Sequence, residues 1–89
     1  MATIRFTAQL ARHLATPAMT AGGATLRDVF DSAFANDALL RSYVLDEQGR
    51  VRRHVNIFVD GRMIADRQRL SDRIAAGAEI YVLQALSGG

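Results

Sequence analysis

The most concentrated group of chemically active side chains is a short basic run in the second half of the chain. It consists of Arg50, Arg52, Arg53 and His54. Guanidinium groups bind phosphates and carboxylates, so this run could contact a nucleotide, a nucleic acid or an acidic protein surface. Because no stacking aromatic side chain is interleaved with it, nucleic-acid binding is disfavoured and docking onto an acidic partner is favoured. A solvated strand edge without any ligand is the simplest alternative.

The residue sets of common enzyme active sites are missing from the sequence. The chain has no Cys, which excludes disulfides, thiolate catalysis, Cys-ligated zinc and iron–sulfur clusters. Its two histidines, His13 and His54, lie far apart without carboxylates at ligand spacing, so we predict no metal site. No Ser-His-Asp set, phosphate-binding loop or acid–base carboxylate pair can be assembled. We therefore expect a chain that is not an enzyme by itself and binds no cofactor.

The composition predicts one small folded domain. With 89 residues, 49% of them hydrophobic and 22% charged, the chain can bury a single core and lies outside the range typical of disorder. The net charge is only +2, because nine acidic residues are interspersed with eleven basic ones, all of them Arg. The N-terminus lacks a signal-peptide pattern, and no stretch approaches about 18 consecutive apolar residues. We expect a cytoplasmic chain without a membrane span.

The first half of the chain predicts two strands and a helix. Ile4, Phe6 and Ala8 alternate with polar residues, which indicates a half-buried strand, and Ala18–Ala21 is a candidate hairpin partner. Thr25 is a helix N-cap. The apolar stripe that follows it has helical spacing and consists of Leu26, Val29, Phe30, Ala33 and Phe34. Residues 38–45 suggest one or two further helical turns.

The second half predicts three strands. The apolar run Val55–Val59 enters Asp60-Gly61, a dipeptide suited to a two-residue hairpin turn, and residues 62–64 form the short partner strand. Residues 70–74 suggest one capped helical turn, and Glu79–Gln84 is the last strand. This order predicts an α+β protein with a β-grasp, ubiquitin-like roll. A mixed four- to five-stranded sheet, covered by one main helix, would hold the first and last strands parallel in its middle.

Strand alternation also predicts a docking surface. When the alternate residues of the last two long strands point to the helix, Phe58, Tyr81 and Leu83 point to the opposite face. Large exposed side chains next to the end of a chain are typical of a partner-binding site. Leu86 and Arg53 complete the predicted partner-binding residues. In the alternative interpretation, residues 38–44 or 9–16 cover this face.

Four segments carry a resemblance to a known family. They are Phe6-x-Ala8-Gln9-Leu10, the sequence GRVRRHVNIFVDG at 49–61, the closing strand GAEIYVLQ at 77–84 and the terminal pair Gly88-Gly89. Together they resemble the MoaD/ThiS family of ubiquitin-like sulfur-carrier proteins over nearly the whole chain. The resemblance divides the sequence into a β-grasp domain at residues 1–84 and a C-terminal tail at residues 85–89.

The resemblance implies a specific chemistry at the chain end. An E1-like, ATP-dependent adenylyltransferase/sulfurtransferase would activate the carboxylate of Gly89 and convert it to a thiocarboxylate. Gly88 would keep the tail slender, because a residue without Cβ passes through a narrow channel. The thiocarboxylate would donate sulfur to an acceptor synthase in cysteine, molybdopterin or thiamine biosynthesis. The segment at 46–61 looks somewhat more like carriers that feed a cysteine synthase than like the other two groups.

Two other functions remain open at the level of sequence. The chain could be a ubiquitin-like modifier whose terminal carboxyl is joined to target lysines. Alternatively, it could be a non-catalytic β-grasp interaction module whose terminal glycines are only an unstructured end. Neither fold nor composition separates these functions from that of a carrier.

Overall fold

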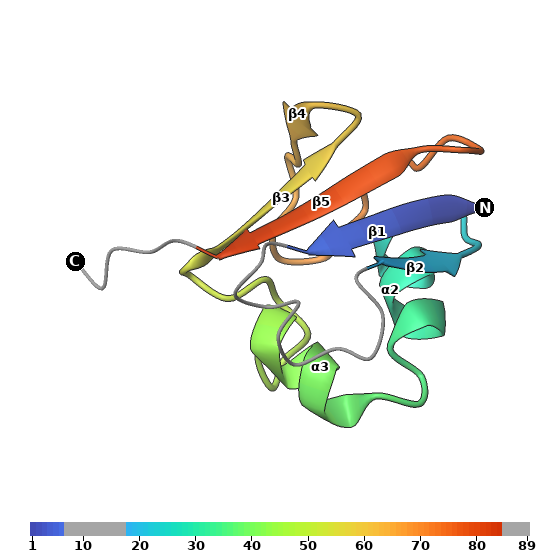
Figure 1. The fold of residues 1–89 in the computed structure, drawn as a ribbon. Helices are drawn as coiled ribbons and strands as arrows, with labels where there is room; N and C mark the ends of the chain where they lie inside the picture. The colour runs from blue at the N-terminus through green and yellow to red at the C-terminus, as the bar shows by residue number, and fades with distance from the viewer. Residues whose placement is uncertain (7–17, 85–89) are drawn as a thin grey trace.

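The structure, a computed structural model, describes residues 1–6 and 18–84. Five strands form one mixed sheet in the order β2-β1-β5-β3-β4 (Figure 1). The strands are β1 (Ala2–Phe6), β2 (Ala18–Ala21), β3 (Val55–Val59), β4 (Arg62–Met63) and β5 (Glu79–Gln84). The helices are α2 (Leu26–Ala33) and α3 (Ala38–Val44). This is the β-grasp arrangement that the sequence predicts. The proposed tail at 85–89 lies outside the described residues.

The sheet is built around its last strand. β5 pairs in parallel with β1, where Ile4 lies opposite Ile80, and antiparallel with β3, where Ile57 lies opposite Val82. These four side chains are fully buried on the helix-facing side of the sheet. The parallel pairing of the first and last strands is confirmed.

Helix α2 begins where the N-cap pattern predicts. The Thr25 hydroxyl accepts a hydrogen bond from the Asp28 amide at 3.3 Å, which satisfies one of the free N–H groups of the first turn. Leu26, Val29 and Phe30 are buried against the sheet. The aromatic rings of Phe30 and Phe34 are in contact, with their centroids 5.0 Å apart.

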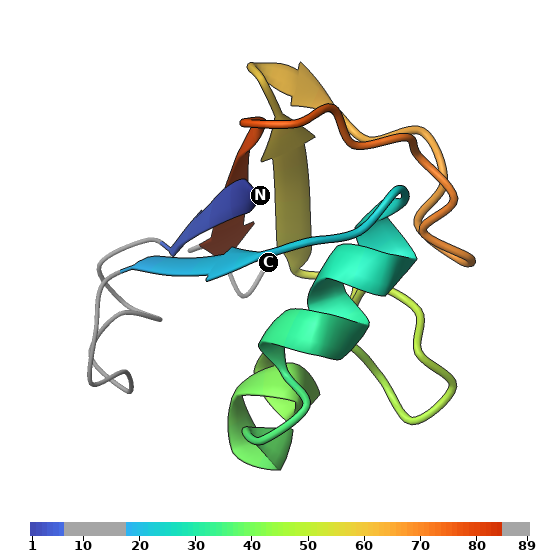
Figure 2. The same ribbon diagram turned by 90° about the vertical axis from the view of Figure 1, so that its right-hand side faces the viewer.

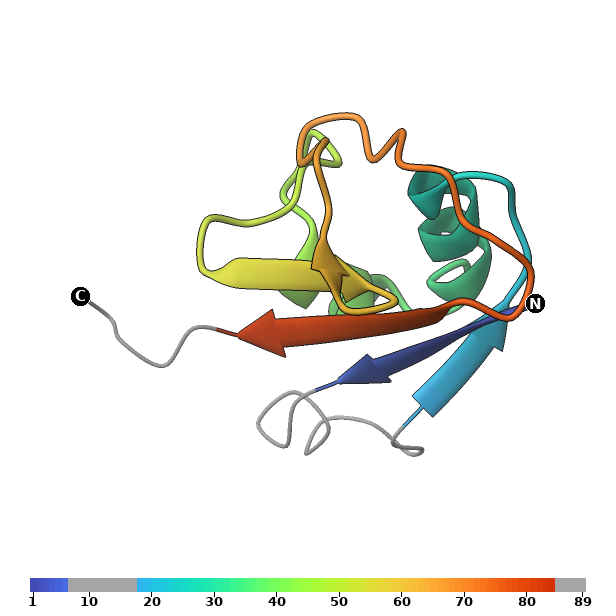
Figure 3. The same cartoon turned by 90° about the horizontal axis from the view of Figure 1, so that it is seen from above.

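Two helices cover the sheet: α2, the predicted main helix, and α3, where the sequence predicts one or two further helical turns. Asp37 caps α3 by accepting a hydrogen bond from the Leu40 amide at 3.0 Å, and both Leu40 and Val44 are buried in the core. Figures 2 and 3 show α2 and α3 on the same side of the sheet. The opposite side of the sheet is therefore covered by neither helix.

The predicted helical turn at residues 70–74 is wrong. The segment lies beside the start of α2 without forming a helical turn, and the N–H groups of Leu26 and Arg27 donate to the carbonyls of Asp72 and Leu70, both at 2.9 Å. Helix-starting N–H groups have no partner within their own helix, so this segment supplies one. Leu70 adopts a positive φ of 55° and is fully buried. Local helix propensity is overridden here by a tertiary contact.

The hairpin between β3 and β4 has the predicted turn. Asp60 and Gly61 adopt φ values of 50° and 86°, as a two-residue turn of this kind requires. The Asp60 carboxylate also accepts a hydrogen bond from the Glu79 amide at 3.0 Å, which ties the turn to the start of β5. Among residues 1–6 and 18–84, no helix is long and apolar enough to cross a membrane.

Candidate partner-docking site

The open face of the sheet carries a continuous row of large side chains across four strands. Strand pairing places Arg5 beside Tyr81, Tyr81 beside Phe58, and Phe58 beside Met63. Leu83 follows Tyr81 on the same face of β5. We call Phe58, Met63, Tyr81 and Leu83 the apolar patch.

The apolar patch is accessible to solvent on the described part of the chain. Met63, Tyr81 and Leu83 expose 54%, 38% and 37% of their surfaces, whereas Phe58 is half-buried. The predicted orientation of Phe58, Tyr81 and Leu83 is therefore correct, although Phe58 is less exposed than expected. An open depression on this face is lined by Phe58, Gly61, Glu79, Tyr81 and Leu83.

One of the two predicted covers for this face is wrong. Residues 38–44 form α3, which lies on the other side of the sheet (Figure 2). Its buried residues, Leu40 and Val44, belong to the core. The other predicted cover, residues 9–16, lies outside the described residues. The apolar patch is thus a surface that no described helix covers.

Met63 is a patch residue that the sequence analysis missed. The signal for it was present, because a two-residue turn at Asp60-Gly61 places Val59 opposite Arg62 and Phe58 opposite Met63. Counting the register outward from the turn would have assigned Met63 to the same face as Phe58. The position of Arg5 beside Tyr81 could not be counted from a turn, because it depends on the parallel pairing of β1 with β5.

The chain leaves the sheet next to the apolar patch. Gln84 is the last residue of β5 and lies opposite Val55, the first residue of β3. We call Gln84 the tail root, because the proposed tail begins after it. Leu83 of the apolar patch directly precedes the tail root. The predicted site residues Leu86, Gly88 and Gly89 lie outside the described residues.

The basic run lies at the same end of the sheet as the tail root. The Val55 amide donates to the Arg52 carbonyl at 3.0 Å, which closes a turn that exposes Arg53 and His54. Because Val55 lies opposite Gln84, this turn is beside the tail root. Arg53, predicted from sequence as a partner-binding residue, is thus near the patch but on a separate element.

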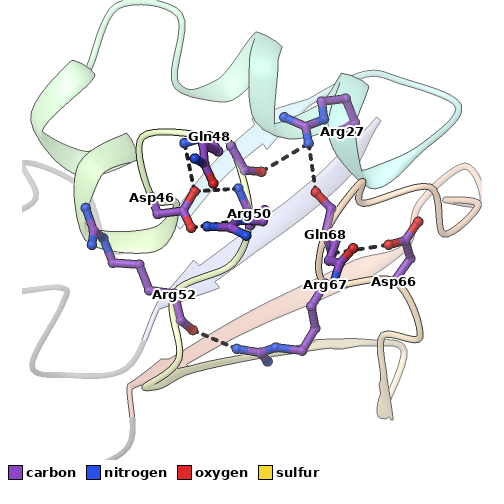
Figure 4. Close-up of polar contacts among 9 residues, drawn as sticks. Arg27, Asp46, Gln48, Arg50, Arg52, Asp66, Arg67 and Gln68 are labelled. Carbon is purple, nitrogen blue, oxygen red and sulfur yellow. Dashed lines mark hydrogen bonds and ion pairs between the residues drawn. The ribbon is translucent and has the colours of Figure 1, made fainter.

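A network of arginines holds the loops behind this turn (Figure 4). The Arg27 guanidinium donates to the carbonyls of Gly49 at 3.0 Å and Gln68 at 3.4 Å, so it links α2 to two loops. The Arg67 guanidinium donates to the Arg52 carbonyl at 2.6 Å, and the Val51 amide donates to the Arg67 carbonyl at 2.9 Å. These contacts fix the position of the basic run relative to the core.

We expect Arg27→Ala to destabilise the protein by about 1.5–3 kcal/mol, because hydrogen bonds from a charged donor contribute about this much. The midpoint of thermal unfolding should fall by roughly 10 °C for a domain of this size. Arg62→Ala is the matched control, since Arg62 is exposed and makes no side-chain hydrogen bond to another described residue. Equal midpoints for the two variants in thermal denaturation followed by circular dichroism would refute a structural role for Arg27.

Asp66 organises the second of these loops. Its carboxylate accepts hydrogen bonds from the backbone amides of Arg69 at 2.9 Å and Gln68 at 3.2 Å and from the hydroxyl of Ser71. The amide of Arg69, followed by the Ser71 hydroxyl, lowers the pKa of Asp66 to about 2.

Asp46 organises the first loop in the same way. Its carboxylate accepts a hydrogen bond from the backbone amide of Arg50, which is the largest cause of its lowered pKa. The Asp46 carboxylate also forms an ion pair with the Arg50 guanidinium at 3.0 Å.

The lowered pKa of Asp66 predicts a pH dependence of stability. A carboxylate whose pKa is lower in the folded than in the unfolded state stabilises the protein above about pH 4. This stabilisation is lost as the pH falls through the folded-state pKa of about 2. Asp66→Asn should therefore lower the thermal midpoint at pH 7, and its difference from the parent protein should shrink towards pH 2. A difference that stays constant between pH 7 and pH 2 would show that the charge of Asp66 is not the cause.

The described residues offer no metal centre, since no group of three or more His, Asp or Glu side chains among them could hold an ion. His13 lies outside them. What the geometry provides instead is an apolar patch and a basic turn on either side of the point where the chain leaves the sheet. Such an arrangement suits binding to another protein.

Comparison with known proteins identifies the family of this chain. The family model of the ThiS family matches residues 4–89. The chain belongs to the ThiS family. No curated protein matches it in sequence. The resemblance inferred from the sequence is therefore confirmed.

Several solved structures share the fold of this chain. CysO from Mycobacterium tuberculosis is 26% identical, with a TM-score of 0.81, and the match covers 97% of this chain and 100% of that chain. SAMP1 from Haloferax volcanii is 26% identical, with a TM-score of 0.79 and coverage of 99% and 98%. A chain of the BexX/CysO complex from Amycolatopsis orientalis is 21% identical, with a TM-score of 0.84 and full coverage of both chains. This ThiS-family chain thus shares the ubiquitin-like, β-grasp fold with these solved structures.

Proposed function

We propose that this ThiS-family protein is a sulfur carrier that is used as a protein co-substrate and has no catalytic activity of its own. The reactive group is the carboxylate of Gly89, which an E1-like partner adenylates with ATP and converts to a thiocarboxylate. The observation that carries this proposal is the extent of the family match, which continues through Gly88 and Gly89 to residue 89.

The chemistry of a carboxylate explains why ATP is needed. A carboxylate is a poor acyl donor because it has no good leaving group. Attack of a Gly89 carboxylate oxygen on the α-phosphorus of ATP forms an acyl-adenylate and releases pyrophosphate. A sulfur nucleophile then attacks the acyl carbon and displaces AMP. The chain has no Cys, so the sulfur must come from the partner or from a separate donor.

The geometry of the chain end is compatible with delivery into a buried active site. A fully extended tail from Gln84 to Gly89 would span about 20 Å. Gly88 and Gly89 have no Cβ, so the end of such a tail fits a narrow channel. The globular domain would stay outside, where Tyr81 and Leu83 contact the partner. Leu86 would extend this apolar contact into the tail.

The acceptor that we propose is a synthase of cysteine biosynthesis. The support for it is the likeness of residues 46–61 to carriers that feed a cysteine synthase. Molybdopterin and thiamine synthesis are the two alternatives within the family. Incubation of the thiocarboxylate form with purified candidate acceptors, followed by detection of the sulfur-containing product, separates the three.

A protein modifier is the second candidate function. It is favoured by the 26% identity to SAMP1, a small archaeal modifier protein. A modifier joins its terminal carboxyl to target lysines, so it leaves conjugates of high mass that survive denaturation. Such conjugates, lost when Gly88 and Gly89 are removed, would favour this function over sulfur transfer.

Reconstitution tests the carrier function directly. The purified protein is incubated with the adenylating enzyme of its own host, ATP and a sulfide source, and its intact mass is measured. We expect a form heavier by the mass difference between sulfur and oxygen, which appears only when ATP is present. An unchanged mass under all these conditions would contradict the proposal and favour an interaction module that does not use its tail.

A further inference from the structure

A second surface near the tail root is concave and basic. It lies between the loop that precedes β3 and the loop that precedes Leu70, and it is lined by Asp46, Arg50, Val51, Arg53, Arg67 and Gln68. We call this surface the basic recess. It was not evident from the sequence, because Arg67 is distant along the chain from the basic run and is brought to it by the backbone contact with Val51.

Only one of the three arginines that line the basic recess has a carboxylate partner among the described residues. Its only carboxylate, Asp46, is paired with Arg50 at 3.0 Å and also accepts from two backbone amides. Arg67 is held in place by its bond to the Arg52 carbonyl but has no carboxylate partner among the described residues. Arg53 is exposed and makes neither a hydrogen bond nor an ion pair with another described residue. Two guanidinium groups therefore remain available to an incoming anion.

The position of the recess relates it to the tail. Arg53 is in the turn closed by the Val55 amide, and Val55 lies opposite the tail root, Gln84. Any protein that encloses the tail must contact the residues on either side of Gln84. The apolar patch supplies one flank, on the open face of the sheet, and the basic recess supplies the other.

We propose that Arg53 and Arg67 receive acidic side chains of the activating enzyme at the rim of the channel that takes up the tail. This inference rests on the proposed function, because it assumes that an enzyme takes up the tail. Carboxylates suit guanidinium groups, which can bind them in a bidentate manner. A nucleotide is a poorer fit, since none of the described residues that line the recess is aromatic and could stack on a base.

Such contacts should act mainly on association. Opposite charges at the edge of an interface increase the association rate, and salt screens this effect. We therefore expect that reversing the charge of Arg53 lowers kcat/KM at low ionic strength and leaves kcat unchanged. A purely structural role for Arg53 would instead lower the thermal midpoint, and the structure gives it no such role.

The experiment compares Arg53→Glu with Arg73→Glu. Arg73 is also exposed, pairs through its backbone with Thr25 at the start of α2 and not with the tail root, and makes no side-chain hydrogen bond to another described residue. ATP–pyrophosphate exchange by the purified adenylating enzyme of the same host is measured at several KCl concentrations. Relative to wild type, Arg53→Glu should lower kcat/KM about tenfold or more at low salt, and this gap should narrow as salt rises. Arg73→Glu should stay within about twofold of wild type.

The possible outcomes separate the two proposals. If wild type supports exchange and the two variants are equal, the role of the basic recess is refuted and the carrier function stands. If wild type supports no exchange, the carrier function fails and the inference fails with it. Titration of the free protein with inorganic phosphate completes the test, because submillimolar binding that is lost in Arg53→Glu would reassign the recess to a small anion.

Discussion

Deletion of Gly89 should lower ATP-dependent activation by a factor of about 100 or more. The variant still ends in a glycine carboxylate, but its reactive group is one residue short, a distance of about 3.5 Å in an extended chain. A displacement of the reacting atoms by about 1 Å can already cost a factor of about 100. ATP–pyrophosphate exchange with the adenylating enzyme of the same host measures the effect.

This deletion should leave the domain intact. The described core lies between Ala2 and Val82, so removal of residue 89 should change the thermal midpoint by no more than about 2 °C. The matched control is a substitution elsewhere in the tail, Ser87→Ala, which keeps the length. Equal exchange rates for the Gly89 deletion and the parent protein would refute a reaction at the terminal carboxylate.

The second large effect is expected at the apolar patch. The double substitution Tyr81→Ala and Leu83→Ala should weaken binding to the adenylating enzyme about 30-fold or more. Truncation of central interface residues typically costs about 2 kcal/mol or more, and each 1.4 kcal/mol is a factor of ten. Both side chains are more than one third exposed, so the loss should fall on the dissociation constant and not on folding. Surface plasmon resonance with the purified enzyme measures it.

Leu39 provides the matched control for the apolar patch. It is 64% exposed, but it lies on α3, on the opposite side of the sheet. Leu39→Ala removes a similar apolar surface and should change the dissociation constant by less than about twofold. If Leu39→Ala and the double variant weakened binding equally, the open face of the sheet would not be the docking surface.

Much of the fold could be predicted because its elements have strong local patterns. Alternation fixes the faces of β3 and β5, and Asp60-Gly61 fixes the turn between β3 and β4. The N-cap at Thr25 and the stripe that follows it fix α2. The same alternation predicted which side chains lie on the open face, since strand residues separated by two always share a face.

What the sequence could not predict depends on contacts between distant segments. Residues 70–74 have a helix-like pattern, but two of their carbonyls accept hydrogen bonds from the free N–H groups at the start of α2, and they form no helical turn. Arg67 joins the basic recess only because its loop bonds to Val51. Arg27 could be assigned to the polar face of α2, but its bonds to Gly49 and Gln68 depend on how two loops fold over the helix. No local pattern encodes these pairings.

The central claim is that the carboxylate of Gly89 carries sulfur. The most direct test is the intact mass of the untagged protein purified from its own host. We predict a fraction of the protein heavier by the mass difference between sulfur and oxygen, with the shift located at Gly89 by fragmentation and absent when Gly89 is deleted. A single unmodified mass, unchanged when the adenylating enzyme, ATP and a sulfur source are supplied, would contradict the claim.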